Sequence, residues 1–246
     1  MKDKVNILGV GFTINSEDEI LKLIRTELVK RKSVRKKIVI FTPNPEQLSA
    51  SKSSKHIRDI LNQAQISLPD GVGIIWAAKL LGKPIHARIT GIDFMKKLVK
   101  SVAERPVTTG FFGGQEGVAE HTADCLRKKW PKLKVGYASN VYDKKKMIES
   151  DTDILFVALG FPKQEEWILA HKDEVPASII MVVGGAFDFI SGKIPRAPKL
   201  IRQVGLEWLF RLILQPWRIF RQARIWHFGA LILLEALSRR LKMNNQ

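Results

Sequence analysis

The sequence predicts an α/β fold, in which helices cover both faces of a mainly parallel, doubly wound sheet. Short apolar segments alternate with helical patterns over residues 1–195, and about seven of these segments have the length of buried strands. Glycines and polar side chains follow several of the segments, at the point where each expected strand ends. Residues 196–246 differ in composition, and we expect them to form a basic helical appendage to the first 195 residues.

The expected elements follow one another with recognisable helix starts. Ser16 with Glu19 predicts a capping box, and Asn44 followed by Pro45 predicts another helix start. Thr90 is the expected cap of a later helix. The helices are expected to end near residues 32, 63, 81, 103, 130 and 150. The expected strands are residues 5–10, 38–41, a short segment near 66, 107–112, 133–137, 154–159 and 179–183.

Residues 67–76 form the most informative stretch of the chain. An apolar segment ends at Pro69, Asp70 follows, and Gly71 and Gly73 lead into an apolar helical pattern. This order predicts a strand, a tight turn and a helix N-terminus, which places Asp70 at the carboxyl edge of the sheet. Open α/β sheets bind their ligands at that edge. Two roles remain open for Asp70: an N-cap of the following helix, or a catalytic acid or base.

Other polar and glycine-rich segments are expected at the same edge. Thr42 and Asn44 follow the second strand, where they either cap a turn or face a ligand beside Asp70. Arg88 is either a clamp for phosphate or carboxylate or a surface arginine. The Gly113-Gly114 turn offers free N–H groups to a phosphate, although α/β proteins also use such turns for packing.

Two further motifs carry less weight. Gly9-Val10-Gly11 resembles the start of a dinucleotide-binding fingerprint, but Ile14 stands where the third glycine is required. The triplet Asp151-Thr152-Asp153 is of the kind that holds a divalent metal in many glycosyltransferases. It precedes a strand and therefore lies at the amino edge, so we interpret it as structural and expect no metal site or cofactor.

Charge and cysteine content restrict the partners and the compartment. The net charge of +17 on 246 residues predicts an anionic partner, such as nucleic acid, a phosphate-rich substrate or an anionic membrane. The single cysteine allows no disulfide within the chain, which is typical of a reducing compartment. The N-terminal residues lack the pattern of a signal peptide, and the longest apolar run, 228–237, is shorter than the roughly 20 residues of a spanning helix.

The C-terminal segment combines basic residues with apolar runs. Residues 196–246 contain ten lysines and arginines against two glutamates. Arg218, Arg221 and Arg224 recur at every third position and share one helical face. Trp208, Trp217 and Trp226 add aromatic side chains that are typical of membrane interfaces. We expect an in-plane membrane helix here, and the alternative is a C-terminal helix packed on the core or on a second copy of the chain.

Together these motifs resemble the WecG/TagA/CpsF family of glycosyltransferases. The resemblance extends over nearly the whole chain, in the right order, and its motifs are specific jointly rather than singly. The matching segments are Thr42-Pro43-Asn44, Leu68-Pro69-Asp70-Gly71, Arg88 with Thr90-Gly91-Ile92-Asp93, Gly113-Gly114, Gly160 to Glu165, Gly184 to Asp188, and Arg196-Ala197-Pro198 through Arg211.

The resemblance implies a Rossmann-like fold and a metal-independent, inverting reaction without a cofactor. The donor would be a UDP-sugar carrying N-acetylmannosamine or a related hexose. The acceptor would be an undecaprenyl-diphosphate-linked sugar on the cytoplasmic face of the membrane, in teichoic acid or another cell-surface polysaccharide pathway. The enzyme would be cytoplasmic and bound peripherally to an anionic membrane, either as a single chain or as a homo-oligomer.

The resemblance also implies roles for individual residues. Asp70 matches the proposed catalytic base of the family, and Thr42 matches a polar residue of the catalytic site. The expected substrate-binding residues are Asn44, Arg88, Gly113, Gly114, Gln164 and Gly185. The expected diphosphate-stabilising residues belong to the appendage that would complete the active site: Arg211, Arg218, Arg221 and Arg224.

Two other functions are consistent with parts of the sequence. The positive charge favours a nucleic-acid-binding protein, but no recognised module is present and apolar runs interrupt the basic tail. The glycines near the N-terminus favour a nucleotide-dependent oxidoreductase, but the fingerprint is incomplete and the second strand ends in Thr42-Pro43 rather than in an acid.

Overall fold

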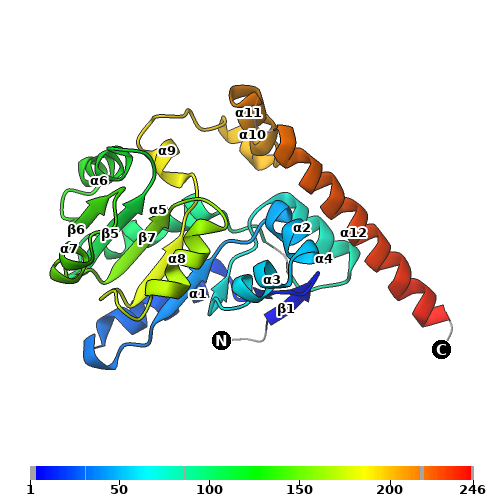
Figure 1. The fold of residues 1–246 in the computed structure, drawn as a ribbon, viewed down its shortest axis with the longest axis horizontal. Helices are drawn as coiled ribbons and strands as arrows, with labels where there is room; N and C mark the ends of the chain where they lie inside the picture. Colours follow the sequence, from blue (N-terminus) through cyan, green and yellow to red (C-terminus); the bar gives the residue numbers. More distant parts are fainter. Residues whose placement is uncertain (1–3, 31, 86, 217–218, 245–246) are drawn as a thin grey trace.

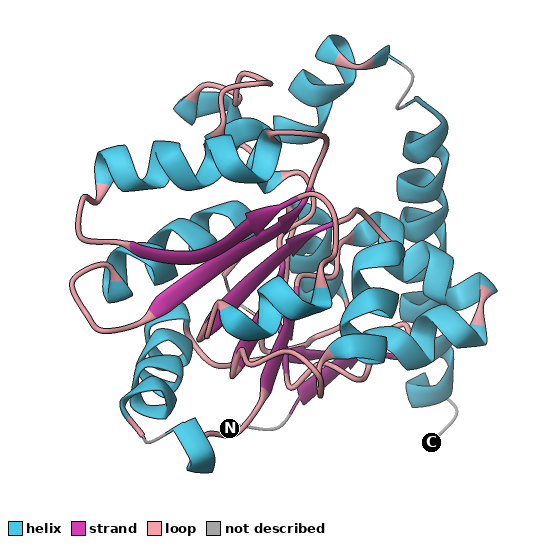
Figure 2. Ribbon diagram, turned by 60° about the vertical axis from the view of Figure 1, so that its left-hand side comes forward, coloured by secondary structure: helices cyan, strands magenta, loops and turns pink. Residues whose placement is uncertain are grey.

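The computed structural model describes residues 4–30, 32–85, 87–216 and 219–244. A six-stranded sheet lies at its centre, with the strand order β4-β3-β8-β7-β5-β6 and parallel pairing throughout. Figure 2 shows these strands side by side with helices around them. The α/β, mainly parallel architecture is therefore confirmed. The strands are β3 (Ile38–Phe41), β4 (Ile66–Ser67), β5 (Thr108–Gly113), β6 (Lys134–Ser139), β7 (Ile154–Ala158) and β8 (Ile179–Val182).

The N-terminal apolar run departs from the prediction of a single strand at residues 5–10. Instead, β1 (Lys4–Ile7) and β2 (Val10–Thr13) form an antiparallel hairpin outside the main sheet. Leu8 and Gly9 make its two-residue turn with φ values of 50° and 88°, the backbone that suits tight hairpins. Leucine is an unusual residue at positive φ, so the sequence lacked a turn signal. Gly9 and Gly11 therefore belong to a hairpin rather than to a nucleotide-binding turn.

Helices cover both faces of the sheet and form two apolar cores. Successive residues of β3 point to opposite sides, with Ile38 and Ile40 in one core and Val39 and Phe41 in the other. The first core includes α1 (Glu17–Val29), α5 (Gly91–Val102), α6 (Val118–Lys129) and α9 (Ala186–Ile190). The second includes α2 (Pro45–Ser53), α3 (Lys55–Leu61), α4 (Val72–Leu80), α7 (Lys144–Glu149) and α8 (Lys163–His171). A 3₁₀ turn covers Lys32–Val34.

The predicted helix starts at residues 16 and 44 are confirmed. The Ser16 side chain accepts a hydrogen bond from the N–H of Glu19, whose side chain accepts one from the N–H of Ser16. Asn44 and Gln47 make the same reciprocal pair, with Pro45 as the first residue of α2. The second pair fixes the chain just beyond β3, at the carboxyl edge of the sheet.

The C-terminal segment forms α10 (Lys199–Gln203), α11 (Glu207–Leu214) and α12 (Ile219–Asn244). Figure 1 shows α12 running along α2 and α4, with α10 and α11 beyond its N-terminal end. Phe228 and Ile232 of α12 are buried in the second core, so one face of this helix packs on the core, as the alternative prediction has it.

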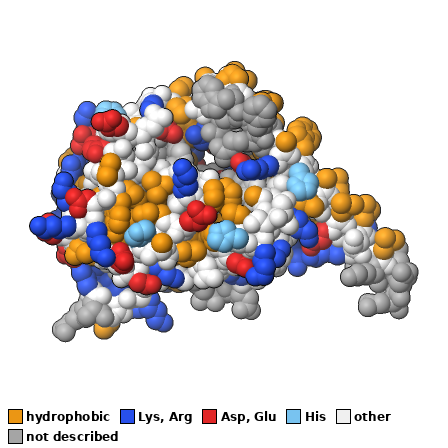
Figure 3. Space-filling view, in the orientation of Figure 1, with side chains coloured by type: hydrophobic (Ala, Val, Ile, Leu, Met, Phe, Trp, Pro, Cys, Tyr) orange, Lys and Arg blue, Asp and Glu red, His pale blue; other side chains and the backbone are white. Residues whose placement is uncertain are grey.

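The opposite face of α12 is exposed. Trp226 is 77% exposed, and Leu233, Leu234 and Leu237 are also exposed. Figure 3 shows apolar side chains along the outer side of this helix and over α11. Among the described residues, no helix combines the length and apolar character needed to cross a bilayer.

Candidate active site

Asp70 lies in the turn that follows β4 at the carboxyl edge of the sheet. Its N–H donates to the Pro43 carbonyl at 3.2 Å, which joins this turn to the loop after β3. Gly71 has a φ of 93° and is the N-cap of α4, without a side-chain capping bond. The Asp70 carboxylate instead accepts a hydrogen bond from the N–H of Gly91, the first residue of α5, at 3.5 Å. The alternative that Asp70 caps α4 is therefore wrong.

The surroundings of Asp70 favour its protonated form. Burial raises the pKa of this carboxyl to about 6, and the charges of Glu207 and Asp93 add to the increase. The N–H of Gly91 and the charge of Arg88 act in the opposite direction. A carboxylate with a pKa near 6 is ionised at neutral pH and is a stronger base than an ordinary aspartate.

Thr42, like Asp70, lies against Gly91 at the start of α5. A Cβ atom added to Gly91 would lie 3.4 Å from both Oγ1 and Cγ2 of Thr42. The same residue, Gly91, donates its N–H to Asp70. The structure therefore brings Thr42 and Asp70 together around the start of α5. Asn44 follows on the same loop, with its side-chain oxygen bonded to the N–H of Gln47 at 3.1 Å.

Arg88 connects this edge to the C-terminal segment. Its Nη2 donates to the carbonyl oxygen of Arg202 at 3.0 Å, and its charge acts on Asp70. It is therefore a half-buried side chain at the edge rather than a surface arginine.

Gln164 lies at the start of α8 and is 3% exposed. Its Oε1 accepts the N–H of Gly184 at 3.2 Å, and its Nε2 donates to Glu165 Oε1 at 3.1 Å. Both ends of the amide are thus bonded within the protein. Gln164 holds the Gly184-Gly185 turn, which follows β8, against α8.

Glu165 is a buried carboxyl for which no role was expected from the sequence. It is 1% exposed, and its Oε1 also accepts from Gln47 Nε2 at 3.3 Å. Its Oε2 has no hydrogen-bond partner among the described residues. Burial raises the pKa of Glu165 to about 7, against the hydrogen bonds from Gln164 and Gln47. The signal that could have indicated it is an acid in the first turn of a helix that follows a fully apolar strand.

Arg211 of α11 reaches the end of β8. A Cβ atom on Gly185 would lie 2.5 Å from Nη2 of Arg211, so the guanidinium lies directly over this glycine. The guanidinium carbon is 4.8 Å from the centroid of the Phe189 ring, and Nη2 is 3.9 Å from Asp188 Oδ2. Because β8 neighbours β3, a positive charge lies along the same edge as Thr42 and Asp70.

Of the other expected tail arginines, Arg224 reaches the start of α2, which follows Asn44 at the carboxyl edge. Arg224 is exposed on α12, with its Nη1 3.5 Å from Glu46 Oε1 at the start of α2. Arg218 and the side chain of Arg221 lie outside the described residues.

Comparison with known proteins decides the family. The model of the glycosyl transferase WecG/TagA/CpsF family matches residues 5–242. The chain belongs to this family. The resemblance found in the sequence motifs is confirmed, and the protein is a glycosyltransferase by family.

Curated relatives of this glycosyltransferase share one name, N-acetylglucosaminyldiphosphoundecaprenol N-acetyl-beta-D-mannosaminyltransferase. The protein of Bacillus subtilis is 31% identical over 208 residues, which cover 82% of this chain and 81% of the relative. The protein of Bacillus spizizenii is 32% identical over 187 residues, 73% of each chain. The protein of Staphylococcus aureus is 29% identical over 228 residues, 89% of this chain and 87% of the relative.

The two glycines at the end of β5 of this glycosyltransferase have positive φ, 104° at Gly113, the last residue of the strand, and 81° at Gly114. A Cβ atom on Gly113 would lie 2.8 Å from the Ala158 backbone carbon, and Gly114 donates its N–H to the Ala158 carbonyl at 2.9 Å. This turn therefore packs closely against the end of β7, which is the packing role left open for it.

The DxD triplet lies at the opposite edge of the sheet, just before β7. Asp153 is 2% exposed and forms an ion pair with Arg35. Its Oδ2 also accepts the N–H of Thr108 at 2.8 Å. These bonds tie the starts of β5 and β7 together. Among the described residues, no group of three or more His, Cys, Asp or Glu side chains could hold a metal ion.

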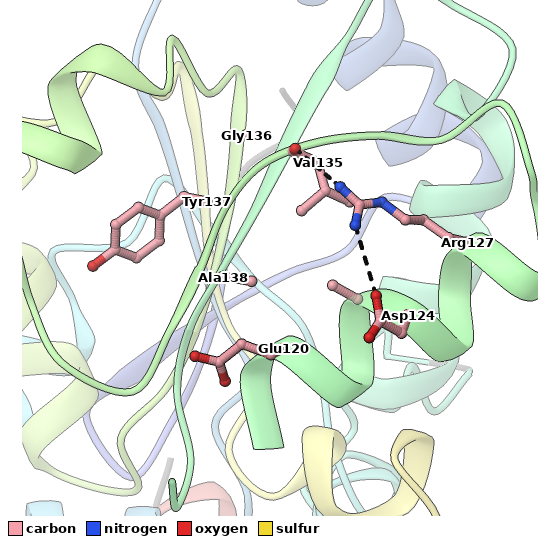
Figure 4. A pocket seen from close by; sticks show the side chains of 8 residues that line it. Glu120, Asp124, Arg127, Val135, Gly136, Tyr137 and Ala138 are labelled. Atoms are coloured by element: carbon pink, nitrogen blue, oxygen red, sulfur yellow. Dashed lines mark hydrogen bonds and ion pairs between the residues drawn. The ribbon is translucent and has the colours of Figure 1, made fainter. Parts of the chain in front are cut away.

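Two hollows of this glycosyltransferase lie beside the edge strand β6, far along the sheet from β4. One of about 590 Å³ is lined by residues of β6 and α7, and a smaller one of about 230 Å³ lies between β6 and α6. Figure 4 shows Arg127 in the smaller hollow, bonded to Asp124 and to the Val135 carbonyl. Neither hollow includes Asp70, Thr42 or Arg211, so we assign the site from the residues at the carboxyl edge.

Proposed function

We propose that this glycosyltransferase moves N-acetylmannosamine, or a related hexose, from a UDP-sugar to polyprenyl-diphosphate-linked GlcNAc, with inversion and without a metal ion. The observation that carries the proposal is Asp70, a half-buried carboxyl with a pKa of about 6 beside Thr42 at the ligand-binding edge of the sheet. The names of the curated relatives support this acceptor and this sugar.

Asp70 is the general base in this mechanism. Its carboxylate takes the proton of the acceptor hydroxyl while the hydroxyl oxygen forms a bond to the anomeric carbon. The bond from that carbon to UDP breaks in the same displacement, and UDP leaves with the bonding electron pair. Because attack and departure are on opposite faces, the anomeric configuration inverts. Thr42, next to Gly91, is well placed to orient the acceptor at Asp70.

The leaving diphosphate gains negative charge and requires positive charge nearby. Arg211 supports the metal-independent proposal, since its guanidinium lies over Gly185 at the same edge. Guanidinium groups bind phosphate oxygens through paired N–H donors. Arg88 is half-buried at the same edge, and Arg218, Arg221 and Arg224 remain proposed contributors. Asn44, Gly113, Gly114, Gln164 and Gly185 form or support the substrate-binding edge in this proposal.

The lipid-linked acceptor explains the proposed peripheral binding to the cytoplasmic face of an anionic membrane. Exposed apolar side chains on α10, α11 and α12 supply the contact, among them Leu200, Val204, Ile213 and Trp226. The net charge of +17 favours an anionic surface. Bound in this way, α10, α11 and α12 would hold the carboxyl edge of the sheet close to the acceptor in the membrane.

The test is UDP release by purified protein given undecaprenyl-diphosphate-GlcNAc and a panel of UDP-sugars, with and without EDTA. We expect release with UDP-N-acetylmannosamine or one related donor, unchanged by EDTA, and a product whose anomeric configuration by NMR is opposite to that of the donor. No release with any donor, together with tight binding of RNA or DNA or with hydride transfer, would replace the proposal with one of its rivals. Loss of activity with EDTA, restored by Mg²⁺ or Mn²⁺, would refute metal independence.

A further inference from the structure

Arg196 lies at the centre of an ion-pair network beside the candidate active site. Its Nη1 and Nη2 donate to the two carboxylate oxygens of Asp93 at 2.6 and 2.8 Å. Its Nε donates to Glu207 Oε1 at 3.0 Å. The Arg196 side chain is 14% exposed, and that of Glu207 is 20% exposed. A planar guanidinium with fixed donors is the group that can bind one carboxylate by two bonds and still reach a second.

The two carboxylates belong to different parts of the chain. Asp93 is the third residue of α5, where Thr90 caps its N–H and donates to its Oδ2 at 2.6 Å. Glu207 is the first residue of α11. Arg196 therefore fastens the first turn of α11 to the first turn of α5.

Each of these two helices carries a residue of the candidate site. Gly91 begins α5 and donates its N–H to Asp70. Arg211 follows Glu207 by four residues and so lies one turn further along the same face of α11. The network therefore connects the residue that supports the proposed base to the residue that carries the positive charge over Gly185.

The network also determines the charge around Asp70. Asp93 on α5 and Glu207 on α11 both disfavour its ionised form, whereas Arg88, on the loop before α5, favours it. Partial burial opposes ionisation of Asp93, yet hydrogen bonds from Arg196 and Thr90 lower its pKa to about 2. Asp93 is therefore an anion at neutral pH, and Arg196 places one positive charge between it and Glu207.

We propose that Arg196 is a positioning residue of the transfer reaction, which holds α11 and Arg211 against the start of α5 and offsets part of the negative charge of two carboxylates beside Asp70. This inference rests on the proposed role of Asp70 as the base. It predicts opposite shifts of the pH profile when the two partners of one ion pair, Arg196 and Glu207, are replaced in turn.

Arg196→Gln leaves Asp93 and Glu207 without their counterion, which disfavours ionised Asp70. The acid limb of the kcat/KM–pH profile should then move to higher pH, and each unit of movement lowers the activity below the midpoint about tenfold. Glu207→Gln removes one of the anions and should move the same limb to lower pH. Both variants loosen α11 and should lower the plateau rate, whereas a purely structural role would lower the rate equally at every pH.

The experiment measures kcat/KM from pH 5 to 9 for wild type, Arg196→Gln, Glu207→Gln and Arg196→Lys. Arg196→Lys keeps the positive charge but loses the paired N–H donors of the guanidinium. The acid limb of its kcat/KM–pH profile should therefore stay near that of wild type, while its plateau rate falls. Arg127→Gln is the matched control, because Arg127 also binds an aspartate and a carbonyl but lies beside β6. Its profile should equal that of wild type. If Arg196→Gln does not fold, as judged by circular dichroism, Glu207→Gln and Arg196→Lys still decide the outcome.

Opposite movement of the two limbs supports the proposal, and limbs that stay fixed or move together overturn it. Asp70→Asn in the same series separates this outcome from failure of the proposed function. An active Asp70→Asn variant means that the assignment of the base is wrong. An inactive Asp70→Asn variant combined with fixed limbs means that only the role of Arg196 is wrong.

Discussion

Up to residue 195 the chain buries its apolar side chains on both faces of the sheet, whereas the segment after it leaves many of its own exposed. Among the residues of that later segment whose side chains the structure describes, few are buried, Phe228 and Ile232 among them, while Leu200, Ile213 and Trp226 are 77%, 71% and 77% exposed. Both regions nevertheless reach the same sheet edge, the first with Asp70 and the second with Arg211. In the first region, backbone hydrogen bonds and strand ends position the residues of the candidate site. In the second region, ion pairs and the packed face of α12 position them. Substitutions in the first should therefore abolish chemistry, and those in the second should give graded effects.

The largest expected effect is on transfer by Asp70→Asn. Loss of a general base costs about 10²–10⁴-fold, and asparagine cannot take the proton of the acceptor. The assay is UDP release at pH 8, with circular dichroism as the check of folding. Glu120→Gln, beside β6, is the control and should keep wild-type activity. Activity of Asp70→Asn within a few-fold of wild type would remove Asp70 from the mechanism.

The next effect separates the two faces of α12. Phe228→Ala removes a ring that is 2% exposed and lies next to Gly73 of α4, so it should lower the free energy of unfolding by about 3–5 kcal/mol. Trp226→Ala, on the exposed face, should leave stability nearly unchanged but weaken pelleting with anionic vesicles. Urea unfolding and vesicle pelleting are the two measurements. Equal loss of stability in both variants would contradict the difference between the faces.

The burial of Phe228 and Ile232 also determines how truncation after residue 196 should affect the rest of the protein. Removing α12 uncovers the apolar surfaces of α2 and α4 that Phe228 and Ile232 cover. The sequence alone did not indicate this dependence, because periodicity does not reveal which face of a basic, apolar helix packs. Point substitutions therefore test the membrane role of the tail more cleanly than truncation does.

Most of the fold and the central residues of the site could be predicted from local patterns. Asp70 and Thr42 each follow a buried strand, and the carboxyl ends of neighbouring parallel strands meet at one edge, so their proximity follows from the order of elements. The hairpin of β1 and β2 was missed because its turn places Leu8 at positive φ, which no local rule indicates.

The remainder depends on contacts between distant residues. Arg196 meets Asp93 across 103 positions, and Gln47 meets Glu165 across 118. Nothing in composition or spacing selects these partners. In the same way, the sequence offered four tail arginines for the diphosphate but could not indicate that Arg211 would lie over Gly185.

Arg211→Gln measures what the C-terminal segment contributes to the rate of transfer. We expect transfer to fall about 10- to 100-fold, the range for loss of a hydrogen bond to a charged group. The loss should persist with a short-chain, water-soluble acceptor, since the charge acts on the diphosphate rather than on membrane binding. Arg239→Gln, at the far end of α12, is the control and should keep full activity on that acceptor. Recovery of Arg211→Gln on the short acceptor would make this residue part of an anchor only.

The smallest expected effect is on stability and has a defined pH dependence. The pKa of Asp70 is raised from its ordinary value of 3.8 to about 6 in the folded protein. Between these values the folded state binds more protons than the unfolded state, so stability falls as the pH rises from about 4 to 6 and then stays lower. Asp70→Asn removes this cost, which solvent at the half-buried carboxyl reduces to on the order of 1–3 kcal/mol. The variant should therefore melt a few degrees above wild type at pH 8, and the difference should vanish near pH 4. Thermal unfolding at the two pH values is the measurement. A difference in melting temperature that is the same at both pH values would mean that burial imposes no such cost on the Asp70 carboxylate.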